Sequence, residues 1–330
     1  MRNRNLLVFV LLLLAGCGPD RSRPPAAPLG PEHYVIAPED RPEPGAYLRY
    51  APPAVGQAGG LDIAITHLTP ADGGPAVALV GVVHVADKPY FDTLQQELDG
   101  YDIVLYEGVK PEQLSNVDWQ RSFTEGGGEA ANLQRDLAGW FGFAYQLEAI
   151  DYGRKNFVHA DMSMEAFLAA GGGDMIPGAG KKASARAADD APAPAGADEE
   201  ATTTAGEVGA VGTPIQSTWK AVKAFGDAAL GAPGPLRSMA RKMFAETMGT
   251  TDIGAALAMR PGFSELILEK RNQVVLERLA EVVGDAKGPI AIFYGAAHMD
   301  DLEAQLTSKF GYSRSSARWL RAWAIRPPLR

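Results

Sequence analysis

The sequence predicts an α/β fold with a mostly parallel central sheet flanked by helices, and three short aliphatic runs carry this prediction. The runs cover residues 76–83, 102–106 and 290–294, with glycine or proline beside them, as is typical of strands buried on both sheet faces. Helical patterns follow the first and third runs. This order of strand and helix is that of parallel β-α-β units.

The first ordered element is expected near Leu61. Apolar residues alternate there, and a turn rich in glycine and proline at 70–75 predicts a hairpin over 61–83. A helix is expected over 87–98, because its apolar residues fall on one helical face. Gly100 then leads into the second strand.

The later elements complete the predicted fold. A helix over 264–283 presents one apolar stripe, and the helix after the third strand should end at Gly311. Alternating apolar residues at 319–325 predict a terminal strand whose arginines lie on a solvated edge. The block 219–259 looks helical in pieces, with methionines spaced for burial, and is expected to cap the carboxyl edge of the sheet.

Composition divides the rest of the chain. Residues 18–60 are rich in proline and alanine and are predicted to be a disordered tether. Residues 61–170 and 216–330 should form the two parts of one domain, the second with the helical cap and last strands. Between them, 171–215 is a low-complexity insertion that we expect to be disordered.

The amino terminus, residues 1–17, resembles a bacterial lipoprotein signal peptide. Arg2 and Arg4 precede nine apolar residues, too few to span about 30 Å of hydrocarbon. Leu14-Ala15-Gly16-Cys17 then resembles a lipobox, which implies cleavage before Cys17, the only cysteine, and its acylation with lipids such as palmitate. Gly18 in place of aspartate favours the outer membrane if the organism is Gram-negative. Ordinary cleavage with an incidental cysteine is the alternative.

The charge balance excludes one class of partner. The chain has 31 basic and 40 acidic side chains, a net charge of −9, and loss of Arg2 and Arg4 with the leader makes this −11. A protein this acidic is not expected to bind nucleic acid.

Three candidate site residues follow the three predicted strands. His84 and His298 each complete a Gly-x-x-His pattern, and Glu107 ends the second strand. Parallel strands bring their carboxyl ends to one sheet edge, where open α/β sheets bind ligands. Two imidazoles and a carboxylate suit an open catalytic metal site. Without a metal, the same trio could act as general base, orienting acid and proton shuttle.

Arg271 falls within the apolar stripe of the helix over 264–283. A guanidinium on an inward face needs an anionic partner. Glu107, a substrate carboxylate or a developing oxyanion would each serve, unless the side chain reaches past the stripe to water.

Several other polar residues have two interpretations. Asp87 and Asp301, each three residues after a Gly-x-x-His histidine, can cap the next helix and hold that histidine. Asp161 or Ser163 is expected to cap the following helix. His159 is either a third metal-binding imidazole or, as we prefer, a loop residue with ordinary hydrogen bonds.

Together these residues resemble the TraB, PrgY, GumN and TIKI family, within a wider group that includes ChaN-type lipoproteins and erythromycin esterases (EreA). The resemblance covers most of residues 61–325, and the insertion departs from it. It rests on Gly81-Val-Val-His84, Tyr106-Glu107-Gly108, Val158-His159-Ala160-Asp161-Met162-Ser163, Lys270-Arg271-Asn272, Gly295-Ala-Ala-His298 and Gly311-Tyr312.

The resemblance implies an EreA/ChaN-like sheet and a metal-dependent hydrolase of the metalloprotease kind. His84, Glu107 and His298 would bind manganese, cobalt or zinc, and Arg271, supported by Asn272, would polarise the scissile group. We expect an enzyme anchored in the cell envelope by its lipid, acting on a peptide or small-molecule substrate through an amide or ester bond. The alternative is a haem- or iron-binding lipoprotein of ChaN type, with Tyr106, Tyr294 or a histidine as axial ligand.

Overall fold

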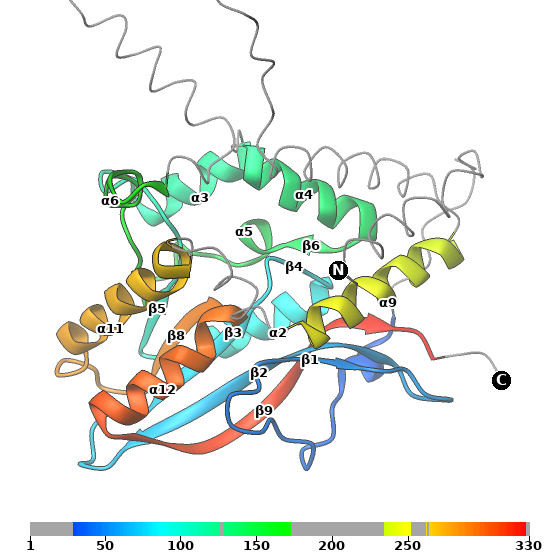
Figure 1. The fold of residues 1–330 in the computed structure, drawn as a ribbon, viewed down its shortest axis with the longest axis horizontal. Helices are drawn as coiled ribbons and strands as arrows, with labels where there is room; N and C mark the ends of the chain where they lie inside the picture. The colour runs from blue at the N-terminus through cyan, green and yellow to red at the C-terminus, as the bar shows by residue number, and fades with distance from the viewer. Residues whose placement is uncertain (1–28, 126–128, 173–233, 252–261, 263, 328–330) are drawn as a thin grey trace, which may run out of the picture.

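The computed structural model describes residues 29–125, 129–172, 234–251, 262 and 264–327 (Figure 1). The predicted signal peptide with Cys17 and nearly all of the predicted insertion lie outside these residues. Within the described ranges, no helix is both long and apolar enough to cross a membrane.

A mixed sheet, seven-stranded within the described residues, forms the centre of the fold. Its strands are β1 (Leu48–Ala51), β2 (Gly59–Pro70), β3 (Val77–Val82), β5 (Ile103–Tyr106), β7 (Phe157–His159), β8 (Ile290–Gly295) and β9 (Tyr312–Ile325). The path is β1-β2-β3-β8-β5-β7, and β9 pairs with β2. The run β3-β8-β5-β7 is parallel, whereas β1, β3 and β9 are antiparallel to β2. The predicted α/β class and parallel centre are confirmed.

Strand β8 lies between β3 and β5, although it follows both in the sequence. The register pairs Val82 with Gly295 and Tyr106 with Phe293. Because these three strands are parallel, they end at the same sheet edge. The sequence-based inference that the third strand joins the first two is therefore confirmed.

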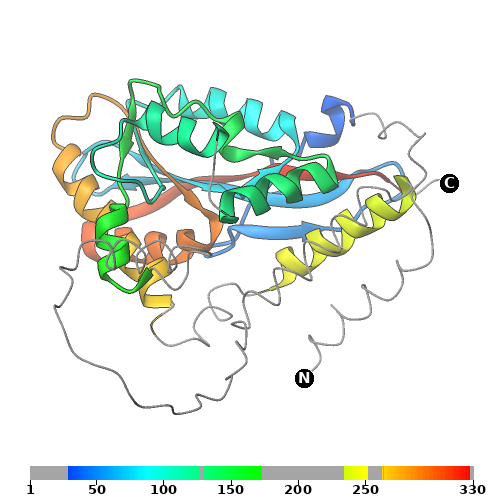
Figure 2. The ribbon, with the colours of Figure 1, turned by 90° about the horizontal axis from the view of Figure 1, so that it is seen from above.

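Helices cover both faces of the sheet (Figure 2). Helix α2 (Lys88–Leu98) packs on one face through Phe91 and Leu94. Helices α11 (Lys270–Val282) and α12 (Met299–Phe310) pack on the other through residues such as Val275 and Leu302. The remaining elements are η1 (Pro31–Tyr34), β4 (Val85–Ala86), α3 (Asn116–Glu125), α4 (Glu129–Phe141), β6 (Ala144–Tyr145), α5 (Gln146–Ala149), α6 (Met164–Ala169), α9 (Gly234–Thr250), η3 (Glu265–Glu269) and η4 (Ala296–His298).

The predicted helix over 264–283 is present with one irregularity. Its first turn, η3, is π-helical, and regular α-helix begins at Lys270. Single π-turns are rare and occur often at functional sites. Here the π-turn directly precedes Arg271.

The predicted tether extends too far, because order begins upstream of Leu61. Strand β1 pairs with β2, and the buried Tyr47 donates a 2.7 Å hydrogen bond to Glu303 on α12. Arg49 forms ion pairs with Asp40 and the fully buried Asp62. The contact of Tyr47 with Glu303 joins positions 256 residues apart, so local composition could not reveal it.

The solvated edge predicted for the C-terminal arginines is wrong for Arg321. This residue is buried and donates to Asp62 and to the Ala58 carbonyl. Strand β9 pairs along the whole of β2, and that partner supplies the buried carboxylate. Alternation in the sequence predicted the strand but not the acid facing it.

Helix α9 is the described part of the predicted helical cap and packs mainly on β1, β2 and β9 (Figure 1). Ala245 is buried in this contact, whereas Met239 is 45% exposed, so the predicted burial of Met239 is wrong. Arg241 on α9 forms a 2.6 Å ion pair with Asp87. Most of the rest of the block 219–259 lies outside the described residues.

We predict that packing of α12 on the sheet is a main source of stability. Leu306 is fully buried, so Leu306→Ala should lower the free energy of unfolding by about 2–5 kcal/mol in urea titration. The exposed neighbour Thr307 serves as the control, since Thr307→Ala should change it by less than about 0.5 kcal/mol. Equal effects would contradict the described packing.

Candidate functional site

Glycines of the two Gly-x-x-His patterns allow close approach at the sheet edge. A Cβ on Gly295 would lie 3.2 Å from Glu107 Oε2, and the Gly295 N–H donates to that oxygen at 2.6 Å. A Cβ on Gly81 would lie 3.0 Å from Ile63 Cγ2. Each pattern therefore combines a tightly packed strand end with a histidine three residues later.

Arg271 joins two carboxylates at this edge. Its Nη2 donates to Glu107 Oε1 at 2.7 Å and also to Asp161, while its Nε donates to Asp161 Oδ1 at 2.9 Å. The side chains of Arg271, Glu107 and Asp161 are 10%, 12% and 0% exposed, so solvent screens these ion pairs little. The inward position predicted for Arg271 is confirmed, and its partners are both acids.

The capping role considered for Asp161 is wrong. Ser163 is the N-cap of α6, and its hydroxyl accepts from the Ala166 N–H. Asp161 instead accepts from the Gly108 and Met162 N–H groups at 2.8 and 2.7 Å, besides Arg271. These donors hold the carboxylate in place beside the guanidinium.

Charge and burial act in opposite directions on the Glu107 pKa. Burial alone would raise it, but the positive charge of Arg271, followed by smaller interactions with His298 and His84, lowers this pKa well below its ordinary range. Burial likewise lowers the Arg271 pKa, and Glu107 and Asp161 reverse this effect and raise it. Glu107 and Arg271 are therefore both charged at neutral pH.

This depressed pKa predicts a pH dependence of folding. Because the native pKa of Glu107 lies below the unfolded value of 4.5, its stabilising contribution is complete above 4.5 and is lost as pH falls through the native value. The difference in free energy of unfolding between wild type and Glu107→Gln should therefore shrink between about pH 7 and pH 3. Denaturant titration at each pH measures it, and a constant difference would contradict the pairing.

His298 is oriented through Asn272. The Asn272 Nδ2 donates to the Asp301 carboxylate at 2.7 Å, which leaves its Oδ1 facing His298 Nδ1 at 2.7 Å. Because an amide oxygen only accepts, Nδ1 carries the proton and Nε2 carries the lone pair. That Nε2 lies 3.6 Å from Glu107 Oε1. Asp301 thus supports His298 indirectly and not by the direct bond predicted.

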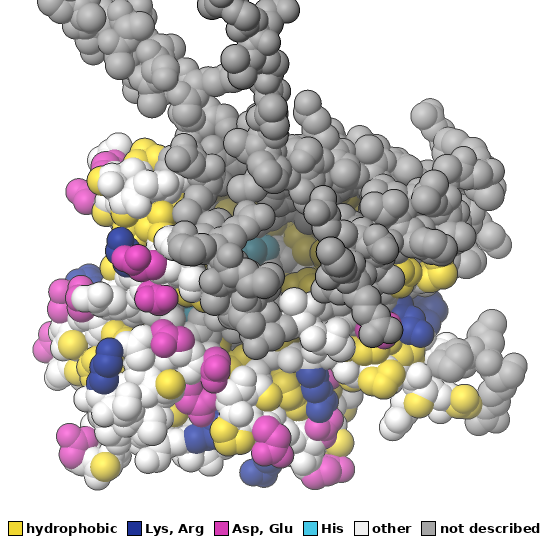
Figure 3. Space-filling model, in the orientation of Figure 1, with side chains coloured by type: hydrophobic (Ala, Val, Ile, Leu, Met, Phe, Trp, Pro, Cys, Tyr) yellow, Lys and Arg dark blue, Asp and Glu magenta, His cyan; other side chains and the backbone are white. Residues whose placement is uncertain are grey.

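His84 is oriented by a residue that the sequence did not suggest, Gln146. Its Nδ1 lies 3.0 Å from Gln146 Oε1, and its Nε2 has no hydrogen bond within the described residues. His84 is exposed. On the face drawn in Figure 3, histidine atoms are visible near hydrophobic side chains. His84 makes no hydrogen bond or ion pair with Glu107 or His298, although its proximity contributes to the lowered Glu107 pKa.

Asp87 does not support His84, so that prediction is wrong. Its carboxylate accepts from Arg241 at 2.6 Å and from the Ala324 N–H at 2.8 Å, and it makes no capping bond to α2. The distant strand β9 and helix α9 supply these donors. Asp87 therefore ties three elements together outside the site.

His159 is the last residue of strand β7 and not a loop residue, but it makes the ordinary hydrogen bond that was expected. Its Nε2–H donates to the Gly108 carbonyl at 2.7 Å, and burial lowers its pKa. It lines a hollow of about 420 Å³ together with Lys110, Asp161 and Ser163. This hollow adjoins the pair of Asp161 and Arg271.

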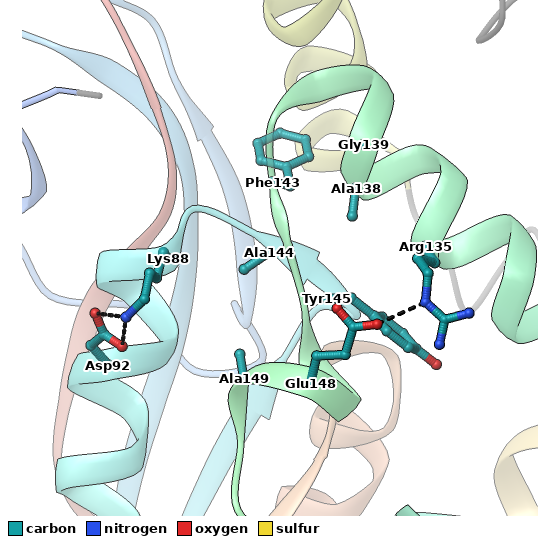
Figure 4. Close-up of a pocket in the computed structure, with 10 residues that line it drawn as sticks. All are labelled: Lys88, Asp92, Arg135, Ala138, Gly139, Phe143, Ala144, Tyr145, Glu148 and Ala149. Carbon is teal, nitrogen blue, oxygen red and sulfur yellow. Dashed lines mark hydrogen bonds and ion pairs between the residues drawn. The ribbon is translucent and has the colours of Figure 1, made fainter. Parts of the chain in front are cut away.

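A second hollow, of about 480 Å³, lies between α2, α4 and β6 (Figure 4). Ion pairs line it, Lys88 with Asp92 at 2.6 Å and Arg135 with Glu148 at 2.7 Å. Because each cation faces an acid, these pairs offer no net charge to a ligand.

Two of the candidate residues, Glu107 and His298, lie at a separation that suits two ligands of one metal ion. In the described part of the chain, no three His, Cys, Asp or Glu side chains converge as an ion requires. Glu107 Oε1 and His298 Nε2, 3.6 Å apart, match the roughly 3.4 Å between two ligands of a tetrahedral ion. His84, the third candidate ligand, is held by Gln146 and makes no hydrogen bond or ion pair with either of them in the described structure.

The fold and site define an α/β protein with a charged cluster at the carboxyl edge of its parallel strands. Comparisons of the chain with family models, with curated proteins and with solved structures found no match. Interpretation of the site therefore depends on its motifs and its geometry.

Proposed function

We propose that this protein is an envelope-anchored, metal-dependent hydrolase of the TraB, GumN and TIKI type, with an EreA/ChaN-like sheet. Its substrate would be a peptide or a small molecule with a related amide or ester bond. One observation carries the proposal: Glu107, Arg271 and His298, from three distant motifs, meet beside the ends of β5 and β8.

His84, Glu107 and His298 would hold manganese, cobalt or zinc. When bound, such an ion supplies a hydroxide near neutral pH and polarises a carbonyl oxygen. The chain itself prepares the ligands. Asn272 fixes the tautomer of neutral His298 with its proton on Nδ1, and Arg271 together with the Gly295 N–H keeps Glu107 ionised.

Arg271 retains a donor for the substrate. Its Nε and Nη2 are occupied by the two carboxylates, whereas Nη1 has no acceptor within the described residues and is not fully buried. A positioned donor of this kind stabilises a developing oxyanion by about 3–4 kcal/mol. This supports the role of Arg271 in polarising the scissile group.

The anchor is part of the same proposal. Cys17 would carry the lipid, and the protein would sit in the cell envelope, at the outer membrane of a Gram-negative organism. The lipobox resemblance supports this location. The substrate would then be met at the membrane surface.

Metal removal tests the proposed reaction. Protein starting after Cys17 should cleave members of a peptide library, lose this activity with a chelator, and regain it with Mn²⁺, Co²⁺ or Zn²⁺. The histidine control is His67→Gln, because His67 is bound to Tyr101 away from the site and its loss should leave cleavage intact. Cleavage that persists after complete metal removal rejects the metal-dependent mechanism.

Haem titration tests the alternative. Tyr106 and Tyr294 are fully buried, and their hydroxyls donate to Asn116 and to the Ala160 carbonyl, so neither oxygen is presented to a ligand. We therefore expect no Soret band of a tyrosine-bound haem, and a histidine such as the exposed His84 is the remaining axial ligand of the alternative. A band that saturates at one or two haems per chain would favour the binding protein.

A further inference from the structure

We infer that Gln146 is a positioning residue for His84, which keeps the proton of the neutral ring on Nδ1 and so leaves the lone pair on Nε2 for a ligand. The role of this arrangement in binding a metal rests on the proposed function. The hydrogen bonds of Gln146 are observed independently of that proposal. Gln146 is the first residue of α5 and is only 5% exposed.

Two contacts from Gln146 hold His84. The side-chain Oε1 lies 3.0 Å from His84 Nδ1, and the backbone N–H donates to the His84 carbonyl at 2.9 Å. The short antiparallel pair of β4 and β6 places these residues side by side, through Val85 with Tyr145. Both the ring and the backbone of His84 are therefore fixed by one residue.

Tyr152 binds the other end of the amide. The Gln146 Nε2 donates to the Tyr152 hydroxyl at 2.7 Å, and Tyr152 is fully buried. With the NH₂ group used in this way, the amide oxygen faces His84. Because this oxygen can only accept, the proton of a neutral His84 lies on Nδ1.

The same device serves both histidines. Asn272 on α11 turns an amide oxygen to His298 Nδ1, as Gln146 does to His84 Nδ1. The NH₂ group of Asn272 donates to the Asp301 carboxylate, and the NH₂ group of Gln146 donates to the Tyr152 hydroxyl. Both imidazoles thus present the nitrogen that a metal or a proton needs. Gln146, which lies between β5 and β7 in the chain, is therefore part of the site.

The ¹⁵N and ¹H resonances of the His84 ring test this inference in metal-free protein. Wild type should show the Nδ1–H tautomer as the main form. Gln146→Met should raise the Nε2–H fraction, because it removes the acceptor, and Gln146→Glu should keep Nδ1–H. A wild-type ring with its proton on Nε2, or a ring unchanged in Gln146→Met, would overturn the inference.

Gln120→Met separates positioning from a general effect on the fold. Gln120 holds the same connection by donating to the Leu147 and Ile150 carbonyls and does not contact His84. It should leave the His84 tautomer unchanged. If Gln120→Met and Gln146→Met shift it equally, the role of Gln146 is structural and the inference is wrong.

Metal affinity distinguishes failure of the inference from failure of the proposed function. With Zn²⁺ alone as the probe, Gln146→Met should weaken binding about 10- to 100-fold, and Gln146→Glu should weaken it less. If wild type binds no Zn²⁺ but shows the predicted tautomers, the metal proposal fails and the positioning role stands. If wild type binds Zn²⁺ and the Gln146 variants match it in tautomer and affinity, the positioning role fails alone.

Discussion

Arg271→Met is expected to lower the free energy of unfolding by about 3–5 kcal/mol, because it leaves two buried carboxylates without their common cation. Glu107 and Asp161 both depend on this guanidinium, and Asp161 has no exposed side-chain surface. Arg271→Lys should lose less, since it keeps the charge but cannot donate from two nitrogens to separate acids. Urea titration measures both variants.

A matched control is available on the same helix. Arg278 is exposed and pairs with the exposed Glu281, so Arg278→Met should change stability by less than about 1 kcal/mol. Adding Asp161→Asn to Arg271→Met should recover part of the loss, because it removes one unpaired charge. Equal losses for Arg271→Met and Arg278→Met would show that the buried ion pairs contribute nothing.

His84→Ala and His298→Ala are each expected to abolish metal uptake and to reduce turnover to background. The Nε2 of His298 lies 3.6 Å from Glu107, and each imidazole faces an amide oxygen through Nδ1, which leaves Nε2 as the nitrogen for a ligand. His84 is exposed, so its removal should leave the unfolding midpoint nearly unchanged and separates chemistry from folding. Asn272→Ala should weaken metal affinity about 10- to 100-fold by releasing His298.

His159→Asn provides the comparison for these variants. His159 is bound to the Gly108 carbonyl and is not in the proposed ligand set, so this variant should keep its metal. Normal turnover in His84→Ala or in His298→Ala would reject the assignment of that residue. Metal loss in His159→Asn with an intact fold would instead add a ligand to the set.

The strands and the inward face of helix α11 could be predicted, because each depends on the pattern of apolar residues within one element. Aliphatic runs predicted β3, β5 and β8. The expected parallel direction of these strands predicted a common sheet edge for His84, Glu107 and His298. The apolar stripe of α11 predicted that Arg271 points inward. In each case the signal lies within one helix or strand.

Features that depend on long-range pairing could not be predicted in the same way. Asp161 looked like a cap because its partner Arg271 lies 110 residues away. Gln146 carries no charge and belongs to no motif, and its contacts with His84 appear only when β4 and β6 pair. Arg321 looked solvated because the strand that buries it, β2, is far away in the sequence.

Elemental analysis of protein purified from residue 18 onward tests the central claim most directly. We predict one Mn, Co or Zn ion per wild-type chain and none in the His84→Ala, His298→Ala double variant. Wild-type protein that cleaves its substrate after metal removal and takes up no ion when Mn²⁺, Co²⁺ or Zn²⁺ is restored would contradict it.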